Sequence, residues 1–141
     1  MYNKTERNIM RAIKFRGKRV NGGEWVKSMT ISHGSIKRKM YKLFFEISPD
    51  KWVGVIPETV GQFIGLLDKN GKEIYEGDII QDGSNSVGVI MWFSTGWGIA
   101  SYSHGFDGLK SYTAIDSFYS DEVKEWSVIG NAFENSALIN G

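Results

Sequence analysis

The sequence contains no cysteine and only two prolines, Pro49 and Pro57. The lack of cysteine excludes a disulfide scaffold, a thiolate metal site and a thiol nucleophile. No uninterrupted apolar run approaches the roughly 20 residues that a membrane-spanning helix needs. The first residues, MYNKTERN, also lack the apolar segment of a secretory signal. These absences predict a soluble, cytoplasmic protein.

Glycine and aromatic residues, in contrast, are plentiful, with 17 Gly and 13% aromatics in 141 residues. Short alternating segments recur along the chain and no helical period persists, which is typical of short strands joined by glycine-bearing turns. We therefore expect a mostly β fold with little helix. Strands are expected at 12–16, 24–32, 39–47, 51–56, 60–67, 72–75, 78–81, 87–93, 97–103 and 125–131, and a single helical turn at 134–138.

The spacing of these segments predicts two regions. Residues 60–131 have the length and rhythm of a small barrel of about five strands. The preceding residues, up to 59, form a separate β-rich arm or small sheet, with plausible seams at SPD (48–50) and PET (57–59).

Charge is distributed unevenly along the chain. Residues 1–42 carry twelve Lys or Arg and two acids, whereas residues 43–141 carry five bases and fourteen acids. Such asymmetry can indicate a surface for nucleic acid or an acidic partner. The alternative is that the two halves pack together, within one chain or between subunits, and their charges cancel.

Candidate residues for binding nucleic acid or an acidic partner lie in the basic half: Arg16, Lys18, Arg19, Lys37, Arg38, Lys39 and Lys42. Together they could track phosphates. Lysines on an edge strand also prevent strand-to-strand aggregation, which is the structural alternative. The interleaved rings of Phe15, Trp25 and Tyr41 could stack on bases, but in a small β protein such rings are more often core.

The stretch GLLDKNGKEIYEGDII (65–80) gathers four carboxylates without the spacing of a calcium loop, because glycine falls at the wrong positions. The pattern instead predicts a hairpin turn followed by a tight bend, with Glu73 and Tyr75 on one strand face. The expected turn residues are Asp68, Asn70, Gly71, Gly77 and Asp78.

Other polar and aromatic candidates are weaker. His33 and His104 lie in SHGS and SHGF, which predict solvated loops rather than metal ligands. A small hydrolase would need Asp68, Glu73, Asp78 or His104 to converge in one cleft. Core positions are the first interpretation for Trp92, Trp97 and Tyr102, which would become ligand-binding candidates if they proved exposed.

Three motifs stand out along the chain: MRAIKFRGK (10–18), QFIGLLDKNGKEIYEGDII (62–80) and VIGNAFEN (128–135). Together they resemble the YopX family, small proteins encoded largely by phages and prophages. The resemblance implies an SH3-like β-barrel at 60–138, a β-rich region at 10–59, and an N-terminal extension at 1–9. It implies no catalytic residues, because the family has none assigned.

These observations predict a non-enzymatic binding or self-associating module with no cofactor and no metal. A protein partner or homo-oligomer is expected, and neither a membrane nor a small-molecule substrate is indicated. The alternative is a nucleic-acid-binding protein that uses the basic N-terminal half.

Overall fold

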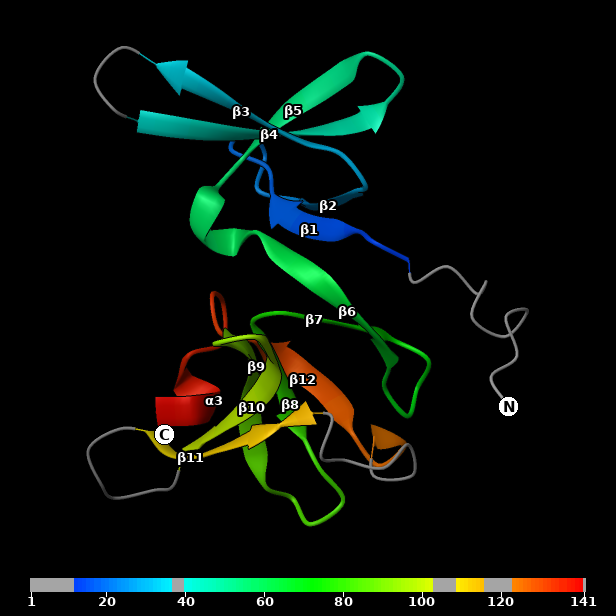
Figure 1. Ribbon diagram of the computed structural model, residues 1–141, viewed down its shortest axis with the longest axis vertical. Helices are drawn as coiled ribbons and strands as arrows, with labels where there is room; N and C mark the ends of the chain where they lie inside the picture. Colours follow the sequence, from blue (N-terminus) through cyan, green and yellow to red (C-terminus); the bar gives the residue numbers. More distant parts are fainter. Residues whose placement is uncertain (1–11, 37–39, 103–108, 116–122, 141) are drawn as a thin grey trace.

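The computed structural model describes residues 12–36, 40–102, 109–115 and 123–140, and in these residues the protein is mostly β, with three antiparallel sheets (Figure 1). The strands are β1 (Phe15–Lys18), β2 (Trp25–Ser28), β3 (Ile31–Ile36), β4 (Met40–Ser48), β5 (Lys51–Val55), β6 (Gly61–Leu67), β7 (Glu73–Tyr75), β8 (Asp78–Gln81), β9 (Val87–Phe93), β10 (Gly96–Tyr102), β11 (Leu109–Ala114) and β12 (Ser127–Asn131). Two short helical elements, η1 (Pro57–Thr59) and α3 (Ala137–Asn140), are also present.

The first core lies between the N-terminal strands and the β3-β4-β5 sheet. Phe45, Val53 and Val55 are buried there, and side chains of β1 and β2 pack against them. Gly17 allows this approach, because a Cβ at that position would lie 3.2 Å from the Val55 Cβ. The Ile56 N–H also donates to the Lys18 carbonyl, which ties the end of β5 to β1.

The second core lies under the five-stranded sheet, whose order is β11-β10-β9-β8-β12. Its buried side chains are Ile64, Ile74, Ile80, Ile90, Val123 and Trp126. Two of them come from β6 and β7, so these strands cover the sheet in addition to belonging to the β2-β1-β6-β7 sheet. Figure 1 shows β6 running between the upper strands and the lower sheet.

None of the three sheets closes into a barrel within the described residues, so the SH3-like closure stays a prediction. The predicted boundary between residues 59 and 60 also stays a prediction. In the structure, β6 follows that boundary and pairs with β1 on one side and β7 on the other.

The structure differs locally from the sequence-based expectations at several elements. The expected strand at 24–32 is divided into β2 and β3, because the Thr30 N–H donates to the Ser28 hydroxyl instead of to a neighbouring strand. The Ser28 hydroxyl in turn donates to the Glu46 carbonyl. His33 is exposed but lies inside β3, so the prediction that it lies in a loop was wrong. β11 was not expected from the sequence, and α3 begins at Ala137, within the expected turn at 134–138 but extending past it.

None of the helices in the described part of the chain has the length and apolar character needed to traverse a bilayer.

Candidate functional site

A buried ion pair joins β1, among the N-terminal strands, to β8 of the five-stranded sheet. Arg16 Nη2 on β1 lies 2.6 Å from Asp78 Oδ1 at the start of β8, and the two side chains are 13% and 1% exposed. The guanidinium carbon is 4.9 Å from the Trp25 ring centroid and 5.0 Å from that of Tyr75. Burial raises the pKa of Asp78, and the Arg16 charge and the Tyr75 amide oppose that shift. The arrangement fixes β1 against the β7–β8 bend.

The bend that places Asp78 depends on Gly77, whose φ of 87° is in the left-handed region that glycine favours. The Gly77 N–H donates to the Ile90 carbonyl, and the Gly77 carbonyl accepts from the Ala132 N–H. Asp78 Oδ2 in turn accepts the Tyr75 N–H at 2.8 Å. The carboxylate is therefore held both by its own bend and by Arg16.

A second carboxylate, Glu73 on β7, is shared by two bases. It pairs with Lys14, and its Oε1 lies 2.9 Å from Lys27 Nζ. Burial by itself would raise the pKa of Glu73, but the hydrogen bonds from the two lysines lower it overall. The Tyr75 hydroxyl donates to the same carboxylate, and Ile74 faces the core. Glu73 and Tyr75 thus share a strand face, as the sequence predicted.

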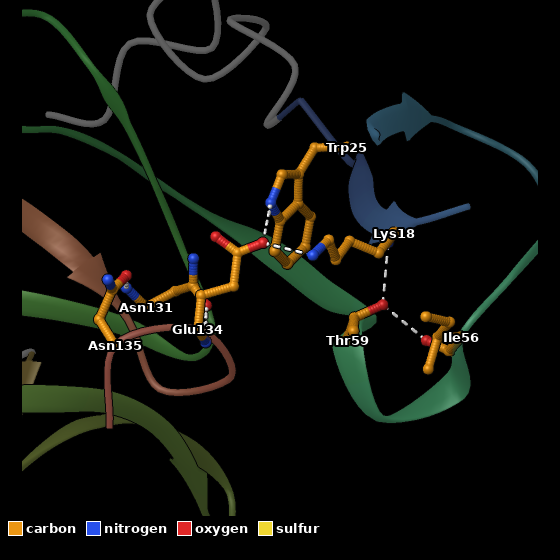
Figure 2. A network of polar contacts seen from close by, with 7 residues as sticks. All are labelled: Lys18, Trp25, Ile56, Thr59, Asn131, Glu134 and Asn135. Atoms are coloured by element: carbon orange, nitrogen blue, oxygen red, sulfur yellow. Dashed lines mark hydrogen bonds and ion pairs between the residues drawn. The ribbon is translucent and has the colours of Figure 1, made fainter. Parts of the chain in front are cut away.

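A third carboxylate, Glu134, reaches from the C-terminal segment to the N-terminal strands (Figure 2). Its Oε1 lies 2.7 Å from Lys18 Nζ and accepts the Trp25 Nε1–H at 3.1 Å. The Lys18 hydrogen bond is the main reason that the pKa of Glu134 is lowered. The Lys18 backbone N–H also donates to the Thr59 hydroxyl, so η1 joins the same network.

Three residues of the predicted basic surface form ion pairs in the structure. Arg16 and Lys18 pair with acids of the C-terminal half, and Arg19 pairs with Glu24 at 2.7 Å. Lys42 is exposed on β4. Lys37, Arg38 and Lys39 lie outside the described residues. The packing of the two halves therefore cancels charge within one chain at Lys14, Arg16, Lys18 and Lys27.

A cleft of about 500 Å³ opens beside these ion pairs. Its walls come from β1, β2, η1, the bend at 76–77, β9 and residues 131–139, so both parts of the chain form it. Trp25 and Arg16 lie at one wall, and Trp92 and Phe133 contribute rings that are 50% and 48% exposed. Trp92 also packs edge-on against Trp97, with ring centroids 4.8 Å apart. Trp92 is therefore not a core residue, contrary to the first interpretation of the sequence.

Two acidic side chains line the cleft without a basic partner. Neither Glu58 nor Glu76 forms an ion pair with a base in the described part of the chain. Burial raises the pKa of Glu76, although the Gln62 amide opposes the shift. Arg16, the basic residue at the cleft wall, is already neutralised by Asp78. The cleft is therefore an aromatic and apolar surface with excess negative charge.

The turn candidates occupy two tight connections. Asp68 Oδ1 accepts the N–H groups of Asn70 at 2.8 Å and Lys72 at 2.9 Å, and the Gly71 N–H donates to the Asp68 carbonyl. Gly71 has φ of 79°. Asp68 Oδ2 accepts the Val128 N–H, a contact with β12 that the sequence did not reveal. Burial by itself would raise the pKa of Asp68, but the three amides lower it overall.

The carboxylates of the hydrolase hypothesis are held by separate partners. Asp68 binds backbone amides, Glu73 binds two lysines, and Asp78 binds Arg16. His104 lies outside the described residues. Among the residues that are described, no three His, Asp or Glu side chains lie together as a metal site would require.

Sequence reasoning missed Glu58, Glu76 and Glu134 as members of the site. For Glu134, the one signal in the sequence was its place in the VIGNAFEN motif (128–135). The asparagines of this motif organise the loop that carries Glu134. The Glu134 N–H donates to the Asn131 side chain at 2.8 Å, and the Asn131 N–H donates to the Asn135 side chain at 3.1 Å (Figure 2). These contacts position Glu134 toward β1, but its partner depends on the packing of the whole chain.

Comparison with known protein families gives a match over most of the chain. A family model described as YopX protein matches residues 14–140, from the start of the N-terminal strands to the last helix. The motifs at 62–80 and 128–135 lie wholly within that range. No curated protein matches the chain.

Proposed function

This chain belongs to the YopX family, and from that premise we propose that it is a phage- or prophage-type, cytoplasmic, non-enzymatic module that binds another protein or a second copy of itself. The observation that carries the proposal is the cleft between the N-terminal strands and the five-stranded sheet. The exposed rings of Trp92 and Phe133 line it. Exposed aromatic side chains beside a concave surface are typical of protein interfaces.

The structural contacts of the carboxylates support a binding function rather than a catalytic one. Asp68, Glu73 and Asp78 each accept hydrogen bonds or ion pairs that hold strands together. Such contacts fix the carboxylate side chains in place. They also account for the pKa shifts of these carboxylates without a catalytic role. The rigid frame that they build positions the cleft walls, which is what a preformed binding site needs.

The arrangement of strands supports an SH3-like interpretation of the C-terminal half. Five strands form one antiparallel sheet, and β6 and β7 cover its core from the other side. SH3-like barrels use aromatic grooves to bind peptides, which agrees with a role for the cleft.

The test compares the wild-type protein with Trp92→Ala and Phe133→Ala as affinity baits in a host or phage-infected lysate. The matched control is Trp52→Ala, because Trp52 is a similarly exposed ring on β5 and lies outside the cleft. A partner retained by wild type and control but lost by both cleft variants supports the proposal. Equal retention by all four proteins would show that binding does not use the cleft.

Self-association is tested by light scattering on the same four proteins across a salt series. If complementary charge holds an oligomer together, raising salt weakens it. If the cleft holds it, the Trp92→Ala protein is smaller than wild type at every salt concentration. A single size for all variants, equal to that of a monomer, would rule out self-association through this surface.

Nucleic-acid binding by the basic half is the second candidate. The exposed Lys42 on β4 favours it, since this residue closely follows the run of Lys37, Arg38 and Lys39 in the sequence. The hypothesis predicts affinity that falls steeply with salt and is lost when those three bases become Ala. Substitution of Arg16 and Lys18, which pair with acids, serves as the comparison. No binding to any DNA or RNA at low salt would dismiss this candidate.

A further inference from the structure

We propose that the cleft binds a Lys or Arg side chain of a basic peptide segment in a partner protein, with Glu58 and Glu76 as the opposite charges and Trp92 as the aromatic contact. This inference rests on the proposed function and specifies the chemistry of its ligand. It is carried by a pairing pattern that recurs across the described residues.

The bases of β1 and β2 that face the C-terminal half each have both an aromatic ring and a carboxylate. The Arg16 guanidinium lies within about 5 Å of the ring centroids of both Trp25 and Tyr75, and it pairs with Asp78. Lys18 Nζ is 5.5 Å from the Phe133 ring centroid and pairs with Glu134.

Glu73 repeats the pattern with two lysines. Lys14 Nζ lies 5.1 Å from the Phe63 ring centroid, and Lys27 Nζ lies 5.4 Å from that of Tyr75. Both bases pair with Glu73. A cation beside an aromatic face and a carboxylate is stabilised by the ring quadrupole and by the opposite charge together.

The cleft offers the same two components for a cation from outside. Trp92 presents a half-exposed ring, and Glu58 and Glu76 line the same cleft. Their charges are not cancelled by any base in the described residues, whereas each of the four bases named above pairs with an acid. The apolar walls suit the methylene stem of a Lys or Arg side chain, whose charged end then reaches the carboxylates.

An anionic ligand fits this surface poorly. The Arg16 guanidinium at the wall is engaged by Asp78 and is 13% exposed. An incoming carboxylate or phosphate would meet the uncompensated charges of Glu58 and Glu76. Like charges brought together in a partly desolvated cleft repel one another. The charge of the cleft therefore selects a basic segment over an acidic one.

The experiment measures binding of a fluorescein-labelled octapeptide of alternating Arg and Ala by fluorescence anisotropy. Its partner probe replaces every Arg by citrulline, which keeps the shape of the side chain and removes the charge. The proteins are wild type, Glu76→Gln, Glu58→Gln and the control Glu125→Gln. Glu125 is exposed and lies outside the cleft, so its substitution makes the same change in net charge elsewhere.

We expect the arginine peptide to bind wild type and the control equally, and the citrulline peptide to bind more weakly to both. Glu76→Gln should weaken arginine-peptide binding about tenfold, the loss of one charge-assisted contact. Glu58→Gln should weaken it less, because Glu58 is more exposed to water. The citrulline peptide should bind all four proteins with nearly the same affinity.

Three results would overturn the inference: no binding of the arginine peptide, equal binding of both peptides, or equal weakening by Glu76→Gln and Glu125→Gln. The proposed function is judged separately, by the dependence of partner capture on Trp92 and Phe133. A cleft that loses its captured partner in Trp92→Ala but binds both peptides equally would be an apolar protein-binding site without cation selectivity. That combination keeps the proposed function and removes this inference.

Discussion

The Asp68 carboxylate in the β6–β7 turn accepts the backbone N–H of Val128 on β12 at 3.0 Å. The Lys69 N–H in the same turn donates to the Trp126 carbonyl at 2.8 Å. A turn near the middle of the sequence is thus bound to β12 by the Asp68 side chain and to Trp126, the residue before β12, by the Lys69 amide. Asp68 is buried and also holds its own turn, so it organises local and long-range structure at once.

Replacement of Asp68 by Asn is expected to lower the free energy of unfolding by about 2–3 kcal/mol, because three backbone amides lose a charged acceptor. Urea denaturation of the two proteins measures the difference. The control is Asp82→Asn. Asp82 Oδ1 accepts the Ser84 and Ser86 amides, both within its own exposed turn. An equal loss in both variants would show that the contact with Val128 contributes nothing.

The same carboxylate predicts a pH dependence. The folded-state pKa of Asp68 is lowered, so the ionised group stabilises the fold above its unfolded-state pKa of about 3.9. This contribution declines as the pH falls through that value toward the lowered folded-state pKa. The stability difference between wild type and Asp68→Asn should therefore be constant near neutral pH and shrink in acid. Denaturation curves at a series of pH values measure it, and a difference that grows in acid would contradict the sign.

The Arg16–Asp78 pair should behave as one unit. Removing either partner alone, by Arg16→Met or Asp78→Asn, leaves a polar group buried without its partner and should cost about 3–5 kcal/mol. The double variant should cost clearly less than the sum of the two single variants. The exposed pair Arg19–Glu24 provides the comparison, where each loss should stay below about 1 kcal/mol. Additive losses for Arg16 and Asp78 would show that the two side chains are not coupled.

A side chain at Gly98 on β10 is predicted to destabilise the fold. A Cβ there would collide with the ring of Tyr112 and lie 3.1 Å from Phe93 Cδ2, and these two rings pack with centroids 3.7 Å apart. Gly98→Ala should therefore lower the free energy of unfolding by about 1–3 kcal/mol. Gly96→Ala on the same strand is the control, because a Cβ there meets nothing within 4 Å. Thermal denaturation compares the two, and similar melting temperatures would refute the steric argument.

Strands and turns were the part of the fold most accessible from the sequence. The alternating segment at 87–93 and the turn after it correspond to β9 and the start of β10. The Asp68–Gly71 turn was predicted from side chains that bond to nearby backbone and from a glycine suited to positive φ. Such features depend on neighbours in the chain, so they can be read locally. The exception at 24–32 arose because the Ser28 hydroxyl accepts the Thr30 amide and donates to Glu46 on another strand, β4.

The sequence by itself determined a mostly β protein of the YopX family with bases concentrated in one half and acids in the other. It left open whether those charges face a ligand or each other. Only the tertiary structure decided that Arg16 pairs with Asp78 and Lys18 with Glu134. It also decided that Glu58 and Glu76 line a cleft in which the basic lining residue, Arg16, already has an acid. The reason is physical: an ion pair depends on distances of a few ångströms between side chains, and strand pairing across the chain sets those distances.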